Sequence, residues 1–238
     1  MIAVKQNERQ LSAKAVSPGQ RYSDTLTLKE RAISSLIIHG IRHKAPLLSL
    51  HGGYAEICRS LNAVHRENPA LFAVNFYKCT AKTGLLRLVY LSMEEAEIRR
   101  IEQALSDTWE QLQEKLLPSL TPRKKYLIIA LEIAERVKYG NTEVYSNHTI
   151  AGLADGKAVC SGMSLLYIHF CQKAGLWVQY ISGTLDGHPH AWTAVHLDGR
   201  KYYIDITVLQ QCPLFYRVFP WRVFKTEKCL RKERYDFE

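Results

Sequence analysis

Three residues in the second half of the chain have types and spacing suited to cysteine-based catalysis, and the first is Cys160. It lies in the glycine-flanked stretch 156–162 and is followed by residues 163–174, whose apolar positions recur at helical spacing. A cysteine at the start of a helix lies among unpaired backbone N–H groups and at the positive end of the helix dipole. Both features favour the thiolate, which is the nucleophilic form. The sequence therefore predicts that Cys160 is a reactive cysteine.

A histidine and an aspartate follow at spacings that a hairpin can bring together. His190 precedes one alternating stretch, residues 191–197, and Asp205 lies in a second, residues 202–208. The Asp-Gly pair between the two stretches is a strong hairpin signal. In such a hairpin the two side chains can share one face, as a base that takes a thiol proton and a carboxylate that orients the imidazole. The set predicts nucleophilic catalysis by Cys160.

The sequence around these positions resembles the transglutaminase-like superfamily of papain-related cysteine enzymes. The resemblance rests on Gly-Lys-Ala-Val-Cys-Ser-Gly around Cys160, His-Ala-Trp from His190, and Asp-Gly-Arg-Lys-Tyr-Tyr-Ile-Asp-Ile-Thr around Asp205. It implies Cys160 as nucleophile, His190 as general base and acid, and Asp205 as the orienting acid. Thr193 and Val208 stand where many relatives have Asn and Trp. These differences leave the subfamily, and so the substrate, open.

The oxyanion of an acyl-transfer intermediate needs hydrogen-bond donors. Backbone N–H groups at the predicted helix start, including that of Cys160, are placed to supply one. For a second donor or a substrate contact the candidates are Asn147, Trp177 and Trp192, and the sequence does not choose among them. The polar stretch 139–150 is expected to be a loop, either beside the cleft or at the surface.

A zinc site is a competing interpretation, because His188 lies two residues before His190 and both could join Cys160 as ligands. Pro189 argues against it, since we expect a bend there rather than a regular strand. The chain has no acidic cluster with calcium-loop spacing, and we expect no metal or organic cofactor.

We expect the remaining cysteines to be small, mostly buried hydrophobes with free thiols: Cys58, Cys79, Cys171, Cys212 and Cys229.

Bulk properties indicate a globular protein of 238 residues with a basic surface. The net charge of +9 favours an anionic partner, such as an acidic peptide, a wall polymer, nucleic acid or a membrane surface, although an inert basic surface also accounts for it. No apolar run approaches the ~20 residues of a membrane span. The first ten residues lack the apolar segment of a secretory signal. The cytoplasm is therefore the expected compartment, with secretion as the alternative.

The predicted fold class is α+β, with the nucleophile helix packed on an antiparallel sheet and a smaller region of helices and strands before it. Three regions are expected: a polar arm (1–25), an N-terminal region (26–120) and a catalytic core with a basic tail (121–238). The N-terminal region resembles that of bacterial transglutaminase-like proteins in Glu-Asn-Pro-Ala-Leu-Phe and Leu-Val-Tyr. Its predicted elements are helices at 26–39, ended by Gly40, 54–67 and 93–117, an extended piece at 47–50, and strands at 70–78 and 85–91.

The function predicted is acyl transfer on amide bonds through a thioester. The donor is a glutamine side chain or a peptide amide of a protein or peptide substrate, and the acceptor is an amine or water. Transamidation, deamidation and peptide hydrolysis are not distinguished. Two rival functions are a catalytically idle binding module of the same fold and a basic protein that binds nucleic acid or an anionic envelope polymer. An intact triad argues against the first, and the lack of an RNP, zinc-finger or P-loop pattern argues against nucleic acid.

Overall fold

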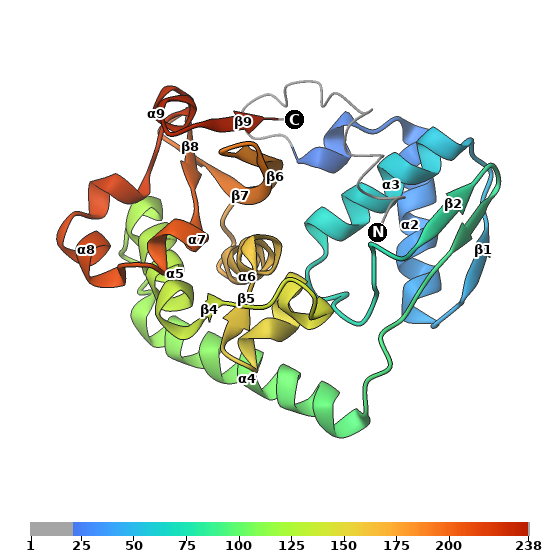
Figure 1. Ribbon diagram of the computed structural model, residues 1–238, viewed down its shortest axis with the longest axis horizontal. Coiled ribbons are helices and arrows are strands. Elements are labelled where there is room, and N and C mark those ends of the chain that lie inside the picture. Colours follow the sequence, from blue (N-terminus) through green and yellow to red (C-terminus); the bar gives the residue numbers. More distant parts are fainter. Residues whose placement is uncertain (1–20, 238) are drawn as a thin grey trace. The chain divides into compact units, whose positions relative to one another are not determined.

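The computed structural model describes residues 21–237, which divide into two compact units between Met93 and Glu94. Figure 1 shows them in blue to cyan and in green to red. The sequence placed the boundary after residue 120, but helix α4 (Glu95–Lys115) packs with the second unit, where Lys115 pairs with Glu132 at 2.5 Å. The predicted arm, residues 1–25, lies mostly outside the described residues.

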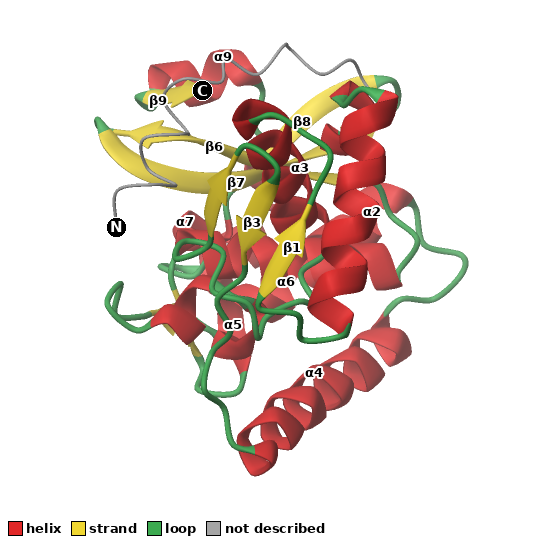
Figure 2. Cartoon of the chain, turned by 90° about the vertical axis from the view of Figure 1, so that its right-hand side faces the viewer, coloured by secondary structure: helices red, strands yellow, loops and turns green. Residues whose placement is uncertain are grey.

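The first unit packs two helices against a small antiparallel sheet with strand order β1-β3-β2. Its core joins apolar residues of both helices, such as Ile37 and Ile57, to Leu86 at the centre of β3. Figure 2 shows β1 and β3 side by side. The elements are η1 (Tyr22–Thr25), α2 (Leu28–Arg42), β1 (Leu47–Ser49), α3 (Tyr54–Glu67), β2 (Thr80–Lys82) and β3 (Leu85–Arg87).

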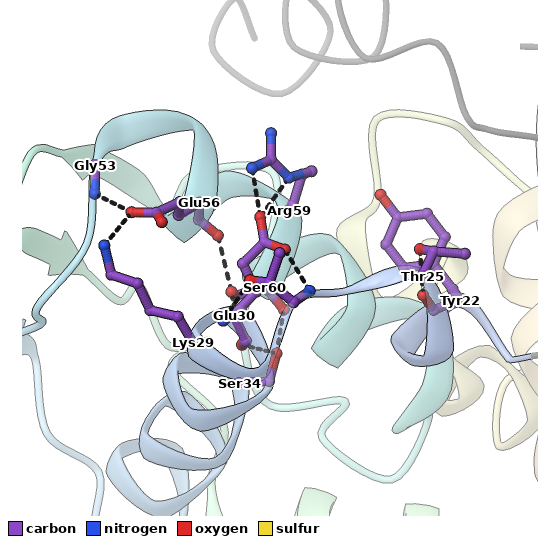
Figure 3. Close-up of polar contacts among 10 residues, drawn as sticks. Tyr22, Thr25, Lys29, Glu30, Ser34, Gly53, Glu56, Arg59 and Ser60 are labelled. Carbon is purple, nitrogen blue, oxygen red and sulfur yellow. Dashed lines mark hydrogen bonds and ion pairs between the residues drawn. The ribbon is translucent and has the colours of Figure 1, made fainter.

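Polar contacts fasten α2 to α3 (Figure 3). The buried carboxylate of Glu30 accepts a hydrogen bond from Arg59 Nε at 2.5 Å, and the Ser60 hydroxyl donates to the Glu30 carbonyl at 2.9 Å. Lys29 pairs with Glu56 at 2.7 Å nearer the surface. Because a buried charge needs a partner, this cluster fixes how the two helices pack.

The sequence suggested that Gly40 ends helix α2, but it does not. The helix runs on to Arg42, and Gly40 is buried inside it. A Cβ at this position would lie 2.5 Å from Leu48 Cδ2. The glycine therefore serves the close approach of Leu48 to the helix rather than helix termination.

Residues 70–78 form turns rather than the predicted strand. Val74 and Lys78 donate their backbone N–H groups to carbonyls three residues earlier, as in turns. Asn75 donates to the Val89 carbonyl and Leu91 to the Ala73 carbonyl, which makes one short contact between the two predicted strands. A single bridge joins Val74 to Tyr90. The predicted strand 85–91 is likewise shorter and ends at Arg87.

The second unit is built around helix α6 (Cys160–Lys173), seen nearly end-on in Figure 1. Helix α5 packs on α6, and so do strands β6 and β7 of a sheet with order β8-β7-β6-β9. The helix is buried on nearly every side, which explains its apolar composition. The other elements are α5 (Pro122–Arg136), β4 (Lys138–Tyr139), η2 (Tyr145–His148), η3 (Ile150–Leu153), β5 (Lys157–Ala158), β6 (Val178–Leu185), β7 (His188–Leu197), β8 (Arg200–Ile204), α7 (Ile206–Leu209), α8 (Pro213–Val218), η4 (Pro220–Val223), α9 (Glu227–Lys232) and β9 (Tyr235–Phe237).

Two tight turns set the register of this sheet. Asp198 and Gly199 have φ of 52° and 73° and join β7 to β8, which confirms the predicted hairpin. A second Asp-Gly turn, Asp186-Gly187, joins β6 to β7 with the same signs of φ. Figure 2 shows β6 and β7 as long, curved strands. The α+β prediction, with the Cys160 helix on an antiparallel sheet, is confirmed.

No helix among the described residues is both long and apolar enough to cross a membrane.

Candidate active site

Cys160 is the first residue of α6, three residues ahead of the predicted helix. The backbone N–H of Val159, which precedes it, donates to the carbonyl of Asn147 at 2.9 Å. At Gly162 a Cβ would lie 2.2 Å from the same carbonyl, so only glycine permits this packing. The backbone N–H groups of the first turn, which have no partner within the helix, remain at the position of the thiol.

His190 lies near the start of β7, opposite Gly183 of β6. The bend expected at Pro189 is absent, because β7 is continuous from His188 and Pro189 pairs with Thr184. Proline has no N–H to donate to a neighbouring strand. It is tolerated here because β7 pairs with β8 only from Thr193 onward, so no strand lies on that edge of Pro189.

Asp205 lies just past β8, which ends at Ile204 rather than continuing to residue 208 as predicted. Its side chain caps helix α7: Oδ1 accepts hydrogen bonds from the N–H groups of Thr207 at 2.8 Å and Val208 at 3.4 Å. Such local bonds compete with strand pairing and are typical of Asp. The other oxygen, Oδ2, accepts a hydrogen bond from His190 Nε2 at 2.7 Å.

The pair is buried and electrostatically coupled. The side chains are 8% exposed for His190 and 2% for Asp205. Burial opposes the charged imidazole, but the hydrogen bonds and charges of Asp205 and Cys160 raise the pKa of His190 to about 10. Burial also opposes the carboxylate, yet the His190 contact above all holds the pKa of Asp205 below its ordinary value. Since Nε2 bonds to Asp205, Nδ1 is the ring nitrogen left for Cys160.

Asn147 lies near the start of α6, but its side chain hydrogen-bonds within the approach loop. It is buried, and its Nδ2 donates to the carbonyl of Asn141 at 2.9 Å. Its backbone carbonyl accepts the hydrogen bond from the Val159 N–H. Asn147 thus holds the approach loop against the helix.

The two predicted tryptophans pack against aromatic side chains, and the Trp192 ring stacks on that of His190 with centroids 5.9 Å apart. Trp192 is fully buried in a cluster with Tyr235, and its indole nitrogen has no partner among the described residues. Trp177 packs against His196, with ring centroids 4.3 Å apart. His196 is six residues along β7 from His190, a strand length of about 20 Å. Trp177 is therefore not placed to contact the reacting group.

Tyr139 is a neighbour of Cys160 that the motif analysis did not single out. Strand β4 pairs in parallel with β5, which places Tyr139 beside Ala158, two residues before Cys160. Its phenol lies close enough to Cys160 to be coupled to it electrostatically. Burial and the neighbouring Cys160 raise the pKa of Tyr139 above its ordinary value. Its only sequence signal was its place in the polar approach loop, which no spacing rule connects to Cys160.

Within residues 21–237, no group of three or more His, Cys, Asp or Glu side chains is arranged to hold a metal ion. His188 is exposed at the start of β7. The zinc interpretation therefore has no ligand set in the described part of the chain.

All six cysteines are free thiols, but not all are buried. Cys58, Cys79 and Cys171 are buried as expected, and burial raises the pKa of Cys79 to about 11. Cys212 and Cys229 are exposed, which corrects their interpretation as packing residues. They lie in the short helical segments after Asp205, where the chain forms little core.

A comparison with protein families matches the part of the chain that contains the candidate site. Residues 110–205 match the transglutaminase-like superfamily, and this stretch ends at Asp205. The chain thus contains a transglutaminase-like domain. A solved structure described as "Crystal structure of a TGase" aligns at 14% identity and a TM-score of 0.41, over 55% of this chain and 43% of that one. This chain therefore spans less than half of that protein. No curated protein matches the sequence.

Proposed function

We propose that the protein is a cysteine-dependent acyltransferase acting on amide bonds, with Cys160 as nucleophile, His190 as base and acid, and Asp205 as the orienting carboxylate. The observation that carries the proposal is the buried 2.7 Å contact between His190 and Asp205, with Cys160 near enough to raise the pKa of His190 as well. A triad of this type is recognised by geometry and by the role of each group. The transglutaminase-like domain supports the same class of chemistry.

The raised pKa of His190 favours a thiolate–imidazolium pair at neutral pH. The Cys160 thiolate attacks the amide carbonyl and forms a tetrahedral oxyanion. His190 then gives its proton to the leaving amine, the C–N bond breaks and a thioester remains. An incoming amine or water loses a proton to His190 as it attacks the thioester, and the thiolate is released.

Two donors are available for the oxyanion in this mechanism. One is the backbone N–H of Cys160, at the first turn of α6. The other is the phenol of Tyr139, which lies beside the start of α6 and is coupled to Cys160. Because its pKa is raised, this phenol keeps its proton at neutral pH and remains a donor. Tyr139 thus takes the role for which the sequence offered Asn147, Trp177 and Trp192.

The amide donor is a glutamine side chain or peptide bond of a protein or peptide, and the acceptor decides the product. Amine acceptors give transamidation, whereas water gives deamidation or peptide hydrolysis. Incorporation of a labelled primary amine, ammonia release and peptide cleavage, each measured against Cys160→Ala, separate the three.

The first test is the alkylation rate of each cysteine as a function of pH, resolved by peptide mapping. In the wild type we expect Cys160 to be alkylated faster than the exposed Cys212, because an imidazolium beside a thiol favours the reactive thiolate. His190→Ala should slow that reaction by about tenfold or more, because the thiolate loses its imidazolium partner.

Cys229 is the internal control for this experiment. Hydrogen bonds from Thr226 lower the pKa of Cys229, so it is also expected to react at moderately low pH. Its reactivity does not depend on His190 and should be the same in both proteins. If wild-type Cys160 reacts no faster than the exposed Cys212 at any pH, the catalytic proposal fails and the binding-module hypothesis replaces it.

A further inference from the structure

The carboxylate of Asp205 receives a second side chain besides His190. The Tyr235 hydroxyl donates to Oδ2 at 2.7 Å, and this is the oxygen that His190 also bonds at 2.7 Å. Oδ1 is occupied by the backbone N–H groups of Thr207 and Val208. Both oxygens are thus held, and Oδ2 is shared between two side-chain donors.

Three contacts fix the position of Tyr235. Strand β9 pairs with β6, which places Tyr235 opposite Leu185. The buried Tyr235 ring packs against Trp192 and His190, with centroids 5.2 and 5.9 Å away. Gly183 makes room for the strand, because a Cβ there would lie 1.9 Å from the Asp236 carbonyl. The hydroxyl is therefore directed at Asp205 by the sheet and the aromatic cluster together.

Tyr235 lies 30 residues beyond Asp205, where the stretch that matches the superfamily ends. We infer that Tyr235 is a positioning residue of the catalytic site, which shares Oδ2 of Asp205 with His190 and fixes the carboxylate against the imidazole. This inference rests on the function proposed above.

Sharing one oxygen moderates how strongly Asp205 stabilises the charged imidazole of His190. Each donor stabilises negative charge on Oδ2, so the bond to either one is weaker than it would be alone. His190 must release its Nδ1 proton to the leaving amine, and an imidazolium that is stabilised too strongly would slow that step. Burial and the Asp205 charge raise the pKa of Tyr235 far above its ordinary value, so it remains a donor.

Three other titratable groups face the pair: Cys160 from α6, Tyr139 from β4 and Tyr216 from α8. Glu233, after α9, acts on Tyr235 and is paired with Lys225. The pKa values of Tyr139 and Tyr216 lie above 10.0, so both are neutral over most of the range of interest. Cys160 exchanges a proton with His190. Replacing Cys160 with alanine therefore isolates the titration of the ring.

The test is an NMR titration of the His190 ring nitrogens in Cys160→Ala, alone and combined with Tyr235→Phe. Phenylalanine keeps the ring contacts and removes only the donor. We expect the pKa of His190 to rise by about 0.5–1 unit, a fraction of a full charge-assisted hydrogen bond. Tyr203→Phe is the matched control, because Tyr203 lies in the same cluster and, within residues 21–237, does not bond Asp205. It should leave the pKa of His190 unchanged.

A second variant reaches the same bond through the backbone. Gly183→Ala displaces β9 and should raise the pKa of His190 in the same direction, so the test does not depend on Tyr235→Phe folding. An unchanged or lowered pKa of His190 in a folded Tyr235→Phe protein overturns the inference. Failure of the proposed function has a different signature, since it shows in wild-type Cys160 alkylation before Tyr235 is altered.

Discussion

The coupling of His190 to Asp205 makes the stability of the fold depend on pH in a defined direction. The pKa of His190 rises from 6.5 to about 10, so its contribution is complete below 6.5 and disappears as the pH rises through about 10. Asp205 has a lowered pKa, so its contribution is present above its ordinary value of 3.8 and is lost at lower pH. The pair therefore stabilises the fold most between these two ordinary values.

We predict that Asp205→Asn lowers the free energy of unfolding by about 3–5 kcal/mol near pH 5, the usual cost of breaking a buried pair. The loss should shrink markedly by about pH 10.5, where His190 is neutral in both proteins. Urea unfolding of both proteins under reducing conditions measures the difference at each pH. An equal difference at both pH values would mean that the pair is not charged in the fold.

The contact between Tyr139 and Cys160 leads to a prediction about catalysis. Tyr139→Phe removes the donor beside the thiol and should reduce turnover of an amide substrate by about 10²–10³-fold, the usual effect of losing one oxyanion donor. Cys160 alkylation should still depend on His190, because the base is untouched.

Tyr202→Phe, which removes a phenol on strand β8, provides the matched control and should leave turnover unchanged. Full turnover in Tyr139→Phe would assign the second oxyanion donor to another group.

At the level of elements, the first turn of α6 depends on Gly162. An added Cβ would meet the carbonyls of Asn147 at 2.2 Å and Thr149 at 3.0 Å, so the helix start or the approach loop must shift. We predict that Gly162→Ala destabilises the protein by about 2–4 kcal/mol and removes the His190 dependence of Cys160 alkylation. Thermal unfolding and alkylation measure the two effects.

Gly53→Ala is the control, since Gly53 has φ of −72° and its added Cβ would meet nothing nearer than 3.6 Å. If Gly162→Ala matches it in both measurements, the close packing of the loop on α6 has no part in positioning the thiol.

Local patterns explain which elements the sequence could predict. Helix α3 has the predicted bounds, because its apolar face is regular and Asn68-Pro69 follows it directly. Residues 70–78 were predicted wrongly because their β-favouring composition also suits a series of turns that buries Phe72, Val74 and Phe76. The end of β8 was missed because Asp205 hydrogen-bonds to the backbone that follows it.

In the candidate site, too, some residues could be predicted from local sequence and others could not. Cys160, His190 and Asp205 could be proposed from short motifs, and the structure brings them together. Tyr139 and Tyr235 reach the site through strand pairings with β5 and β6. A single sequence does not reveal those pairings, so neither tyrosine could be found by spacing.

At the level of the whole molecule, the basic charge is distributed unevenly between the two units. Residues 1–93 contain 13 Lys or Arg against 5 Asp or Glu, whereas residues 94–238 contain 19 against 18. The candidate catalytic residues all lie in the second, nearly neutral unit. An anionic partner and an amide substrate would therefore meet different parts of the chain, and the rival hypothesis of anion binding applies to the first unit.

We predict that a fragment of residues 94–238 retains the pH dependence of Cys160 alkylation but loses affinity for an anionic polymer. Heparin retention should fall to much lower salt in the fragment than in the full chain, because binding of this kind scales with the number of unneutralised Lys and Arg side chains. Circular dichroism of the fragment establishes that it is folded before either comparison. A folded fragment that is retained as strongly as the full chain would place the anionic contacts in the second unit. Anion binding would then involve the same unit as the candidate active site, and an acidic substrate would become the simplest explanation for both.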